Sequence, residues 1–168
     1  MGLVSFFRAL RDSSPSAAKA RAAATHFRIG QLTIAEAERR ARDRILKRDP
    51  FRTSEATPSG VEAERLATLP DELRSLLRTY REIEAGGMRI ERTEIGAYNR
   101  RPEWVQIGTD LEHAAIVARP TDGYIFVIED DGSAELDLVD EYPSIWHYLL
   151  EVAENTTGRE YDQPSDGR

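Results

Sequence analysis

The hydrophobic residues in the first part of the chain recur with helical spacing. Apolar positions at i, i+3, i+4 and i+7 predict a helix over residues 3–10, and Pro-start and Gly-stop signals predict a second over about 15–30. Thr33 and Glu36 form a capping box that opens a third helix, Ile34 to about Arg48. The apolar stripe of this helix is thin, and its other positions are rich in basic residues: Arg39, Arg40, Arg42, Arg44, Lys47 and Arg48.

A second hydrophobic pattern begins after a segment rich in Thr, Ser, Pro and Gly. That segment, residues 52–60, has the composition of a linker. Leu69-Pro70-Asp71 then predicts the start of a helix that runs to Gly86-Gly87. Its apolar face consists of Leu73, Leu76, Leu77, Tyr80 and Ile83.

After the glycine pair the apolar positions follow the alternation of strands. Strands are expected over residues 88–95, 104–107, 113–119, 124–129 and 135–139. Asp-Gly sequences in Pro120–Gly123 and in Asp130–Ser133 predict hairpin turns, because Gly readily takes the positive φ that such turns require. Tyr142-Pro143-Ser144 precedes a last apolar helix, and apolar residues become rare after Asn155.

Consecutive hairpins between two helices predict an α+β fold with an antiparallel-rich sheet and flanking helices. We expect a basic helical N-terminal extension over 1–51, a linker over 52–60, an α+β domain over 61–155 and a flexible tail over 156–168. The length of 168 residues suits one ordinary domain with appended elements.

Composition limits the chemistry of the chain. It has no cysteine, which excludes disulfides, thiolate zinc sites and cysteine nucleophiles and fits a reducing compartment. No apolar run approaches the roughly 18–20 residues that span a bilayer; the longest are Ala114–Ala118 and Tyr124–Ile128. His26, His113 and His147 lack metal-ligand spacing, and no nucleophile elbow, phosphate loop or dinucleotide fingerprint occurs. We therefore expect no catalytic residues, no metal and no cofactor.

Charge is distributed unevenly along the chain. The formal net charge is −7, yet residues 1–60 hold 12 Lys or Arg against 6 Asp or Glu. Residues 103–168 hold 3 against 16. Such asymmetry indicates either an interaction surface or two parts of the chain that attract each other.

Three short segments between Leu69 and Ala153 follow one another in a distinctive order. They are Leu69-Pro70 with an amphipathic helix and Gly86-Gly87, then Trp104–Asp110, which ends in Ile-Gly-x-Asp, and then Asp122–Leu149. In this order they resemble the opening segment, the strand end, and the closing hairpin and helix of the SUKH superfamily of bacterial immunity proteins and fungal cell-wall regulators. Ala85 departs from the Asn expected before the glycine pair, and residues 1–60 have no counterpart.

The resemblance implies a non-enzymatic, cytoplasmic immunity protein that neutralises a cognate toxin, often a nuclease, by occlusion. Such a toxin would carry a basic surface, because nucleases bind phosphate backbones. An acidic stretch is then the expected contact surface, and within this stretch Glu135 and Asp137 share one strand face. Trp104, Tyr98 or Tyr142 would serve as aromatic anchors beside it. The candidate partner-binding residues are Glu129, Asp130, Asp131, Glu135, Asp137, Asp140, Glu141 and Tyr142. The same acids also fit the solvated face of an antiparallel sheet.

Other functions stay open at this point. A regulatory protein-interaction role like that of the fungal relatives would share the fold. The basic helix Ile34–Arg48 would suit a nucleic-acid or acidic-partner adaptor, although such a helix also suits packing on an acidic domain of its own chain. A small enzyme with a carboxylate or histidine site is a third hypothesis. Neither a membrane nor nucleic acid is the expected partner.

Overall fold

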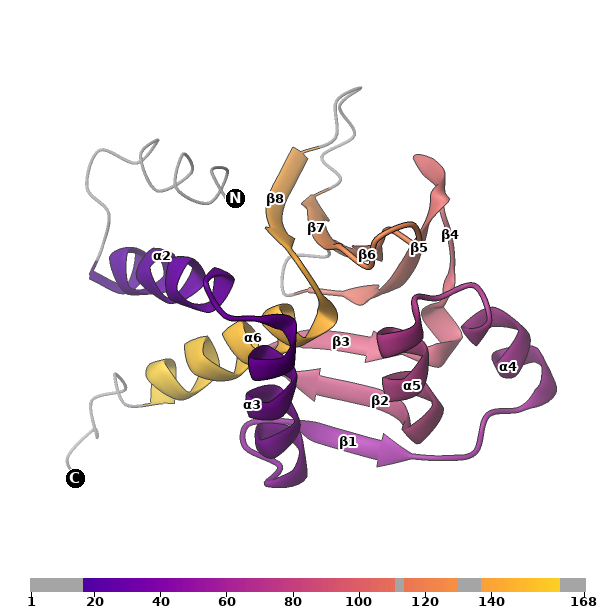
Figure 1. The fold of residues 1–168 in the computed structure, drawn as a ribbon, viewed down its shortest axis with the longest axis horizontal. Helices are drawn as coiled ribbons and strands as arrows, with labels where there is room; N and C mark the ends of the chain where they lie inside the picture. Colours follow the sequence, from indigo (N-terminus) through magenta and orange to yellow (C-terminus); the bar gives the residue numbers. More distant parts are fainter. Residues whose placement is uncertain (1–16, 111–113, 130–136, 161–168) are drawn as a thin grey trace, which may run out of the picture.

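A computed structural model describes residues 17–110, 114–129 and 137–160, and it confirms the α+β fold. One antiparallel sheet is flanked by helices (Figure 1). The helices are α2 (Ala17–Gly30), α3 (Ile34–Leu46), α4 (Gly60–Leu66), α5 (Asp71–Thr79) and α6 (Ile145–Glu160), with the short 3₁₀ turn η1 (Arg92–Glu94). The strands are β1 (Arg52–Glu55), β2 (Tyr80–Ala85), β3 (Met88–Glu91), β4 (Gly96–Tyr98), β5 (Arg101–Thr109), β6 (Ala115–Ala118), β7 (Ile125–Glu129) and β8 (Asp137–Tyr142).

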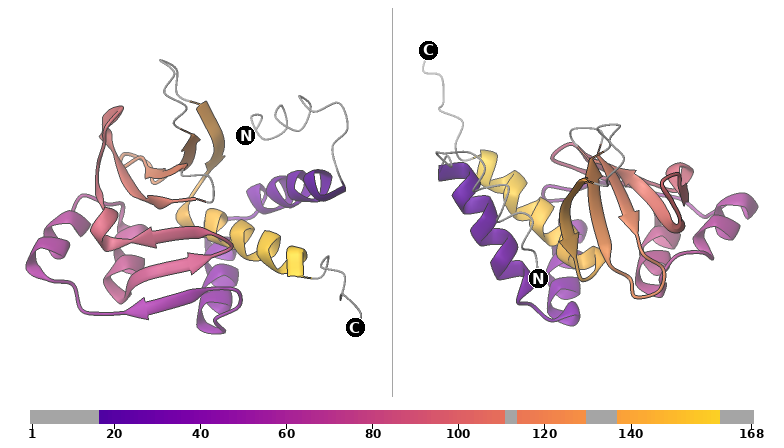
Figure 2. Two further views of the ribbon diagram at one scale, coloured as in Figure 1. Left: turned by 180° about the vertical axis from the view of Figure 1, so that it is seen from behind. Right: turned by 90° about the horizontal axis from the view of Figure 1, so that it is seen from above.

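The eight strands pair in the order β1-β2-β3-β5-β6-β7-β8, with β4 added to β5. Strands β1–β3 lie beside α5, whereas β5–β8 curl away from them above the helices (Figure 2). The two parts of the sheet meet where β3 pairs with β5 through Arg89↔Thr109 and Ile90↔Gly108.

The main hydrophobic core fills the space between the sheet and the helices. It includes Ile29 of α2 and the Ala37, Ala41 and Ile45 stripe of α3, so both N-terminal helices share the core of the rest of the chain. Both helices pack on α6, whose Trp146 is fully buried. The predicted capping box is present, because the Thr33 side chain accepts from the Glu36 amide while the Glu36 carboxylate accepts from the Thr33 amide.

The segment predicted as a linker is partly regular structure. Residues Arg52–Glu55 form β1, which pairs antiparallel with β2, and Ser59 caps the short helix α4. The linker prediction is therefore wrong at these positions. Composition did not reveal β1, because its polar residues are mostly exposed and leave no apolar alternation.

The helix that opens at Asp71 ends earlier than predicted. Helix α5 stops at Thr79, and Tyr80–Ala85 form β2. Gly86 and Gly87, with φ of 56° and 90°, form the turn of the β2–β3 hairpin and not a helix stop. The helical prediction over 80–85 is wrong because Ile83 and Ala85 also fit the alternation of a strand.

Two further predictions differ in outcome. The Pro120–Gly123 hairpin is confirmed: the Arg119 and Tyr124 backbones hydrogen bond across it, and Gly123 has a φ of 79°. The flexible tail predicted from 156 is wrong up to Glu160, because α6 continues to that residue. The helix predicted over 3–10 and the turn predicted over 130–133 lie outside the described residues.

Two buried features hold the layers together. Gly108 of β5 lies so close to β3 that a Cβ there would be 2.1 Å from the Arg89 carbonyl oxygen. The fully buried Arg92 guanidinium donates to the Leu77 and Arg78 carbonyls at the end of α5 and to the Ala56 carbonyl.

No helix within the described ranges combines the length and apolar character needed to cross a membrane.

Candidate protein-binding surface

The face of β4–β8 that points away from the helices carries a second hydrophobic cluster. Strands β6 and β7 are buried on both faces, so alternate residues contribute to separate clusters. The outer cluster consists of Tyr98, Ala115, Val117, Phe126 and Ile128, with Trp104, Tyr124 and Leu138 half-buried around it.

Two arginines lie against three aromatic rings along this outer face; we call these five residues the arginine–aromatic ladder (Arg101, Trp104, Phe126, Arg119 and Tyr124). The Trp104 and Phe126 rings stack with centroids 4.6 Å apart and planes 11° from parallel. The Arg101 guanidinium lies 5.1 Å from the Trp104 ring, and that of Arg119 lies 5.0 Å from Phe126 and 5.2 Å from Tyr124. These distances are within the range of cation–π attraction, which orders the arginines over the rings.

The ladder has the chemistry of a binding surface. Trp, Tyr and Arg are the residues most enriched among the energetically dominant positions of protein interfaces. Trp104 and Tyr124 are half-buried and Arg101 is exposed, so each keeps surface for a partner. Because β5 and the ends of the β6–β7 turn hold these side chains in place, contact with a partner would cost little side-chain ordering entropy.

The acidic residues proposed from the sequence do not form one surface. Asp130, Asp131 and Glu135 lie outside the described residues, and Asp137 is placed only as the backbone partner of Glu129. Glu141 is opposite Phe126 and therefore on the ladder face, whereas Asp140 is opposite Val127 on the helix face. A register shift between Val127 and Ile128 changes which residues of β8 share a face.

Among the proposed aromatic anchors, only Trp104 lies in the ladder. Tyr98 and Tyr142 are buried, with 3% and 5% of their surface exposed. Tyr142 belongs to the helix face, where its hydroxyl donates to Glu151 Oε1 at 3.3 Å. The prediction that Tyr142 is part of the contact surface is therefore wrong, because neighbouring residues cover its side chain.

Tyr142 belongs to a cluster of hydrogen-bonded polar side chains that joins α2, β8 and α6. His26 Nδ1 donates to Glu151 Oε2 at 2.7 Å, and this bond raises the pKa of His26 despite partial burial. Burial raises the pKa of Tyr142 and of Tyr148 well above the ordinary value of 10.0. Both phenols are therefore neutral hydrogen-bond donors at physiological pH. The Tyr148 hydroxyl points to Asp110 at 3.4 Å.

The two described histidines, His26 and His147, have structural partners. His147 Nε2 donates to the Leu32 carbonyl at 3.0 Å, and its Nδ1 is hydrogen bonded to the Ser144 hydroxyl at 2.8 Å. His113 lies outside the described residues. In the part of the chain that the structure describes, no three His, Cys, Asp or Glu side chains come together as metal ligands.

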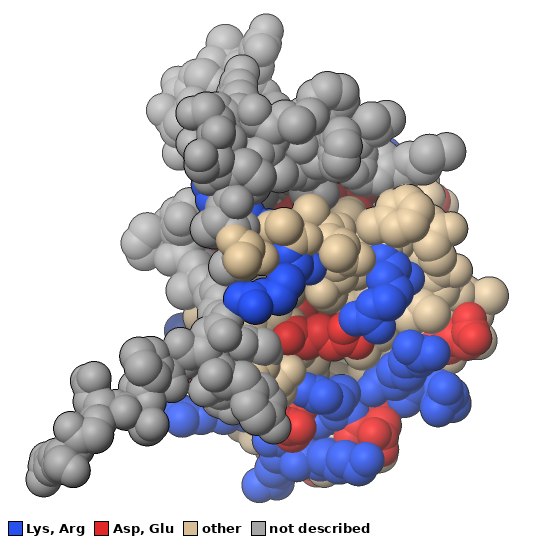
Figure 3. All heavy atoms as spheres, turned by 90° about the vertical axis from the view of Figure 1, so that its left-hand side faces the viewer, with Lys and Arg blue, Asp and Glu red and all other residues tan. Residues whose placement is uncertain are grey.

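The basic N-terminal helices lie on another side of the molecule, where Lys and Arg are interspersed with Asp and Glu (Figure 3). Arg28 pairs with Glu154 of α6, and Arg42 stacks 4.5 Å from the Trp146 ring while pairing with Glu38. Lys47 pairs with Asp43. Part of this positive charge is therefore used within the chain, as expected of a basic helix packed on its own domain.

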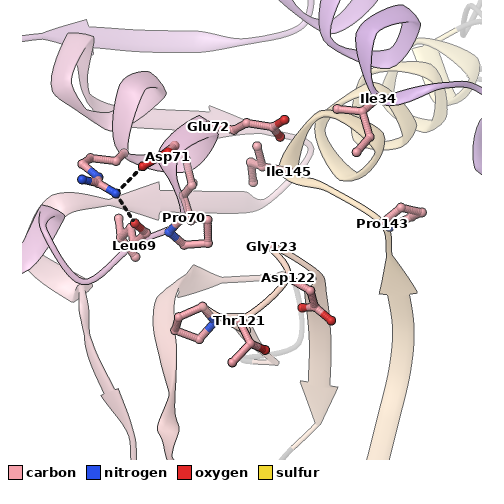
Figure 4. Close-up of a pocket in the computed structure, with 13 residues that line it drawn as sticks. Ile34, Leu69, Pro70, Asp71, Glu72, Thr121, Asp122, Gly123, Pro143 and Ile145 are labelled. Atoms are coloured by element: carbon pink, nitrogen blue, oxygen red, sulfur yellow. Dashed lines mark hydrogen bonds and ion pairs between the residues drawn. The ribbon is translucent and has the colours of Figure 1, made fainter.

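A pocket of about 420 Å³ opens between α5 and the Pro120–Gly123 turn (Figure 4). The aliphatic part of its lining includes Leu69, Ile34 and Ile145, and Glu72 and Asp122 contribute carboxylates. The full lining is Ile34, Leu69, Pro70, Asp71, Glu72, Leu73, Arg74, Pro120, Thr121, Asp122, Gly123, Pro143 and Ile145. No local sequence pattern predicts this site, because its residues come from segments far apart in the chain.

With this geometry established, comparison with known proteins adds no assignment. No family model, curated protein or solved structure matches this chain. The segments that carry the resemblance to the SUKH superfamily nevertheless have clear structural roles. Gly86-Gly87 makes a hairpin turn, Gly108 allows β3 to approach β5, and Leu69-Pro70 meets Asp122-Gly123 at the pocket.

Proposed function

We propose that this chain is a non-enzymatic protein-binding module. The observation that carries the proposal is the arginine–aromatic ladder on the outer face of β4–β8, in which Trp104, Tyr124 and the two arginines keep exposed surface around the buried Phe126. Together with the resemblance to the SUKH superfamily, it favours an immunity protein that neutralises a cognate bacterial toxin by covering its active surface. The expected setting is the cytoplasm of the producing cell.

The ladder supports binding for physical reasons. Its arginines are already ordered over aromatic rings, so docking costs less side-chain entropy than it would for free arginines. Trp104 provides a large apolar area that a partner pocket can desolvate. Glu141 and Gln106 adjoin this face and supply polar groups at its margin. The adaptor hypothesis is less favoured, because α2 and α3 direct their apolar sides and several cations to α6.

The test uses the protein encoded beside this chain as the candidate toxin. We expect the two proteins to co-purify and the full-length chain to protect cells when both are expressed. W104A and R119A should each weaken the complex by tenfold or more, since loss of a dominant contact costs about 2 kcal/mol.

Two controls separate binding from folding. W104F keeps an aromatic ring for stacking on Phe126, and R81A removes an exposed arginine of β2 away from the ladder. Both should fold, and R81A should bind as the wild type does. A chain that neither binds nor protects would overturn the immunity proposal. Binding that survives both W104A and R119A in folded protein would overturn the assignment of the ladder.

A further inference from the structure

We propose that the pocket between α5 and the Pro120–Gly123 turn binds an arginine side chain of the partner, with Glu72 as the receiving carboxylate. The inference rests on the proposed function only in taking this arginine from a protein partner. Figure 4 shows Glu72 on one side of the pocket and Asp122 of the turn on another, with Pro143 and Ile145 nearby.

The charge balance of the pocket identifies Glu72 as the receiving group. Asp71 pairs with Arg74 at 2.5 Å, and Asp122 pairs with Arg119 at 2.6 Å. Within the described ranges, Glu72 has neither a cation nor a hydrogen-bond donor in contact. Among the described residues, the pocket therefore holds one carboxylate with no cation in contact.

The surroundings of Glu72 favour an incoming cation. Glu72 is exposed at the edge of the pocket, and the partial desolvation of its carboxyl raises the pKa; the negative charge of Glu38 adds to this effect and His147 opposes it. A guanidinium in the pocket would offset this rise in pKa, because an opposite charge nearby favours the ionised carboxylate. Glu38 itself pairs with Arg42 and does not compete for that cation.

The pocket lining suits the aliphatic stem and the planar guanidinium of an arginine side chain. Pro70, Pro120 and Pro143 line the pocket, and Ile34 keeps 44% of its surface exposed although it borders an apolar wall. An aliphatic stem would cover this apolar surface. A guanidinium is less strongly hydrated than an ammonium and binds a carboxylate in bidentate fashion, so we assign arginine rather than lysine.

The pocket adjoins the arginine–aromatic ladder through one turn. Asp122 lines the pocket and holds Arg119, whose guanidinium lies against Phe126 and Tyr124. A partner that covers the ladder near Arg119 would therefore reach the pocket with a neighbouring side chain. The two sites form parts of one contact region.

The test is an NMR titration of the ¹⁵N-labelled full chain with acetyl-Gly-Arg-Gly-amide. Saturable shifts are expected at the amides of Glu72, Gly123 and Ile145. The citrulline peptide, which has nearly the same shape without the charge, should bind about tenfold more weakly. E72Q should weaken arginine-peptide binding to a similar extent. E64Q, which alters an exposed glutamate of α4 outside the pocket lining, should leave it unchanged.

Three results would overturn the inference. They are an absence of saturable shifts at the pocket amides, equal binding of the citrulline peptide, and unchanged binding by folded E72Q. Equal or tighter binding of acetyl-Gly-Lys-Gly-amide would overturn the assignment to arginine. The titration needs no toxin, so its failure is distinguishable from a failure of the co-purification and protection assays.

Discussion

Arg119 and Asp122 close the β6–β7 turn with a bidentate ion pair. Arg119 Nε lies 2.9 and 3.0 Å from the two carboxylate oxygens, and Nη2 lies 2.6 Å from Oδ2. This hydrogen bonding raises the pKa of Arg119 and lowers that of Asp122. The pair fixes the arginine of the ladder and one border of the pocket at the same time.

Breaking this pair should affect binding more than folding. We expect D122N to weaken the partner complex by about tenfold, because Arg119 loses the carboxylate that orients it over Phe126 and Tyr124. Thermal unfolding should change little, since exposed ion pairs contribute less than about 1 kcal/mol. D43N is the matched control because it breaks the exposed Asp43–Lys47 pair on α3. Equal losses of affinity in both variants would contradict the prediction.

The contact between β3 and β5 predicts a sharp difference between two glycines. G108A should lower the free energy of unfolding by about 1–3 kcal/mol or more, because the added methyl group meets backbone atoms of Arg89 and Ile90. G96A should change it by no more than about 0.5 kcal/mol, since a Cβ at Gly96 has no neighbour within 4 Å. Urea unfolding of the two variants measures the difference. A G108A protein as stable as G96A would refute the close approach.

Arg92 should be essential for stability although it belongs neither to the ladder nor to the pocket lining. R92A leaves the Leu77, Arg78 and Ala56 carbonyls without their guanidinium donor, at a cost of about 3 kcal/mol or more. R92K should recover only part of this loss, because an ammonium cannot reproduce the planar fork of donors. R81A, at an exposed position of β2, should stay within about 0.5 kcal/mol of the wild type in chemical denaturation.

The bond between His26 and Glu151 should make the docking of α2 depend on pH. Because the folded-state pKa of His26 is raised above 6.5, its stabilisation is complete below pH 6.5 and is lost as pH rises through the folded pKa. E151Q should therefore cost about 1.5–3 kcal/mol at pH 6 and less at pH 8.5. Asp140 and Tyr142 also face His26 and remain in this variant.

The pH prediction has a direct readout and a control. The His26 imidazole signals should titrate above pH 6.5 in the wild type and closer to that value in E151Q. E154Q, which breaks the more exposed pair with Arg28, should not change that titration midpoint appreciably. A His26 midpoint that is equal in the wild type and E151Q would contradict the assignment.

Much of the fold could be predicted from local patterns. The capping box at Thr33 and the Asp122-Gly123 turn depend on neighbouring residues, so their sequence signals were sufficient. The end of α5 could not be predicted, because Tyr80 and Ile83 continue the helical spacing of the leucines before them. In the structure these two residues belong to β2, which leads into the hairpin turn at Gly86-Gly87.

The candidate surface was harder to predict because it depends on strand register. Glu141 and Asp140 are adjacent in sequence yet lie on opposite faces, and the shift near Val127 could not be derived from composition. A signal for the ladder did exist. The continuous apolar runs at Ala114–Ala118 and Tyr124–Ile128 are typical of strands buried on both faces, which implies a second cluster outside the main core.

The short strand β1 forms one border of the sheet and has a consequence for self-association. Its residues Arg52–Glu55 are charged or polar and mostly exposed, and its pairing with β2 is interrupted at Glu55. Without β1, the backbone groups of β2 would be open to pairing with the sheet of another copy. A segment with the composition of a linker thus covers the edge of β2 and prevents this strand from pairing edge to edge with the sheet of another copy.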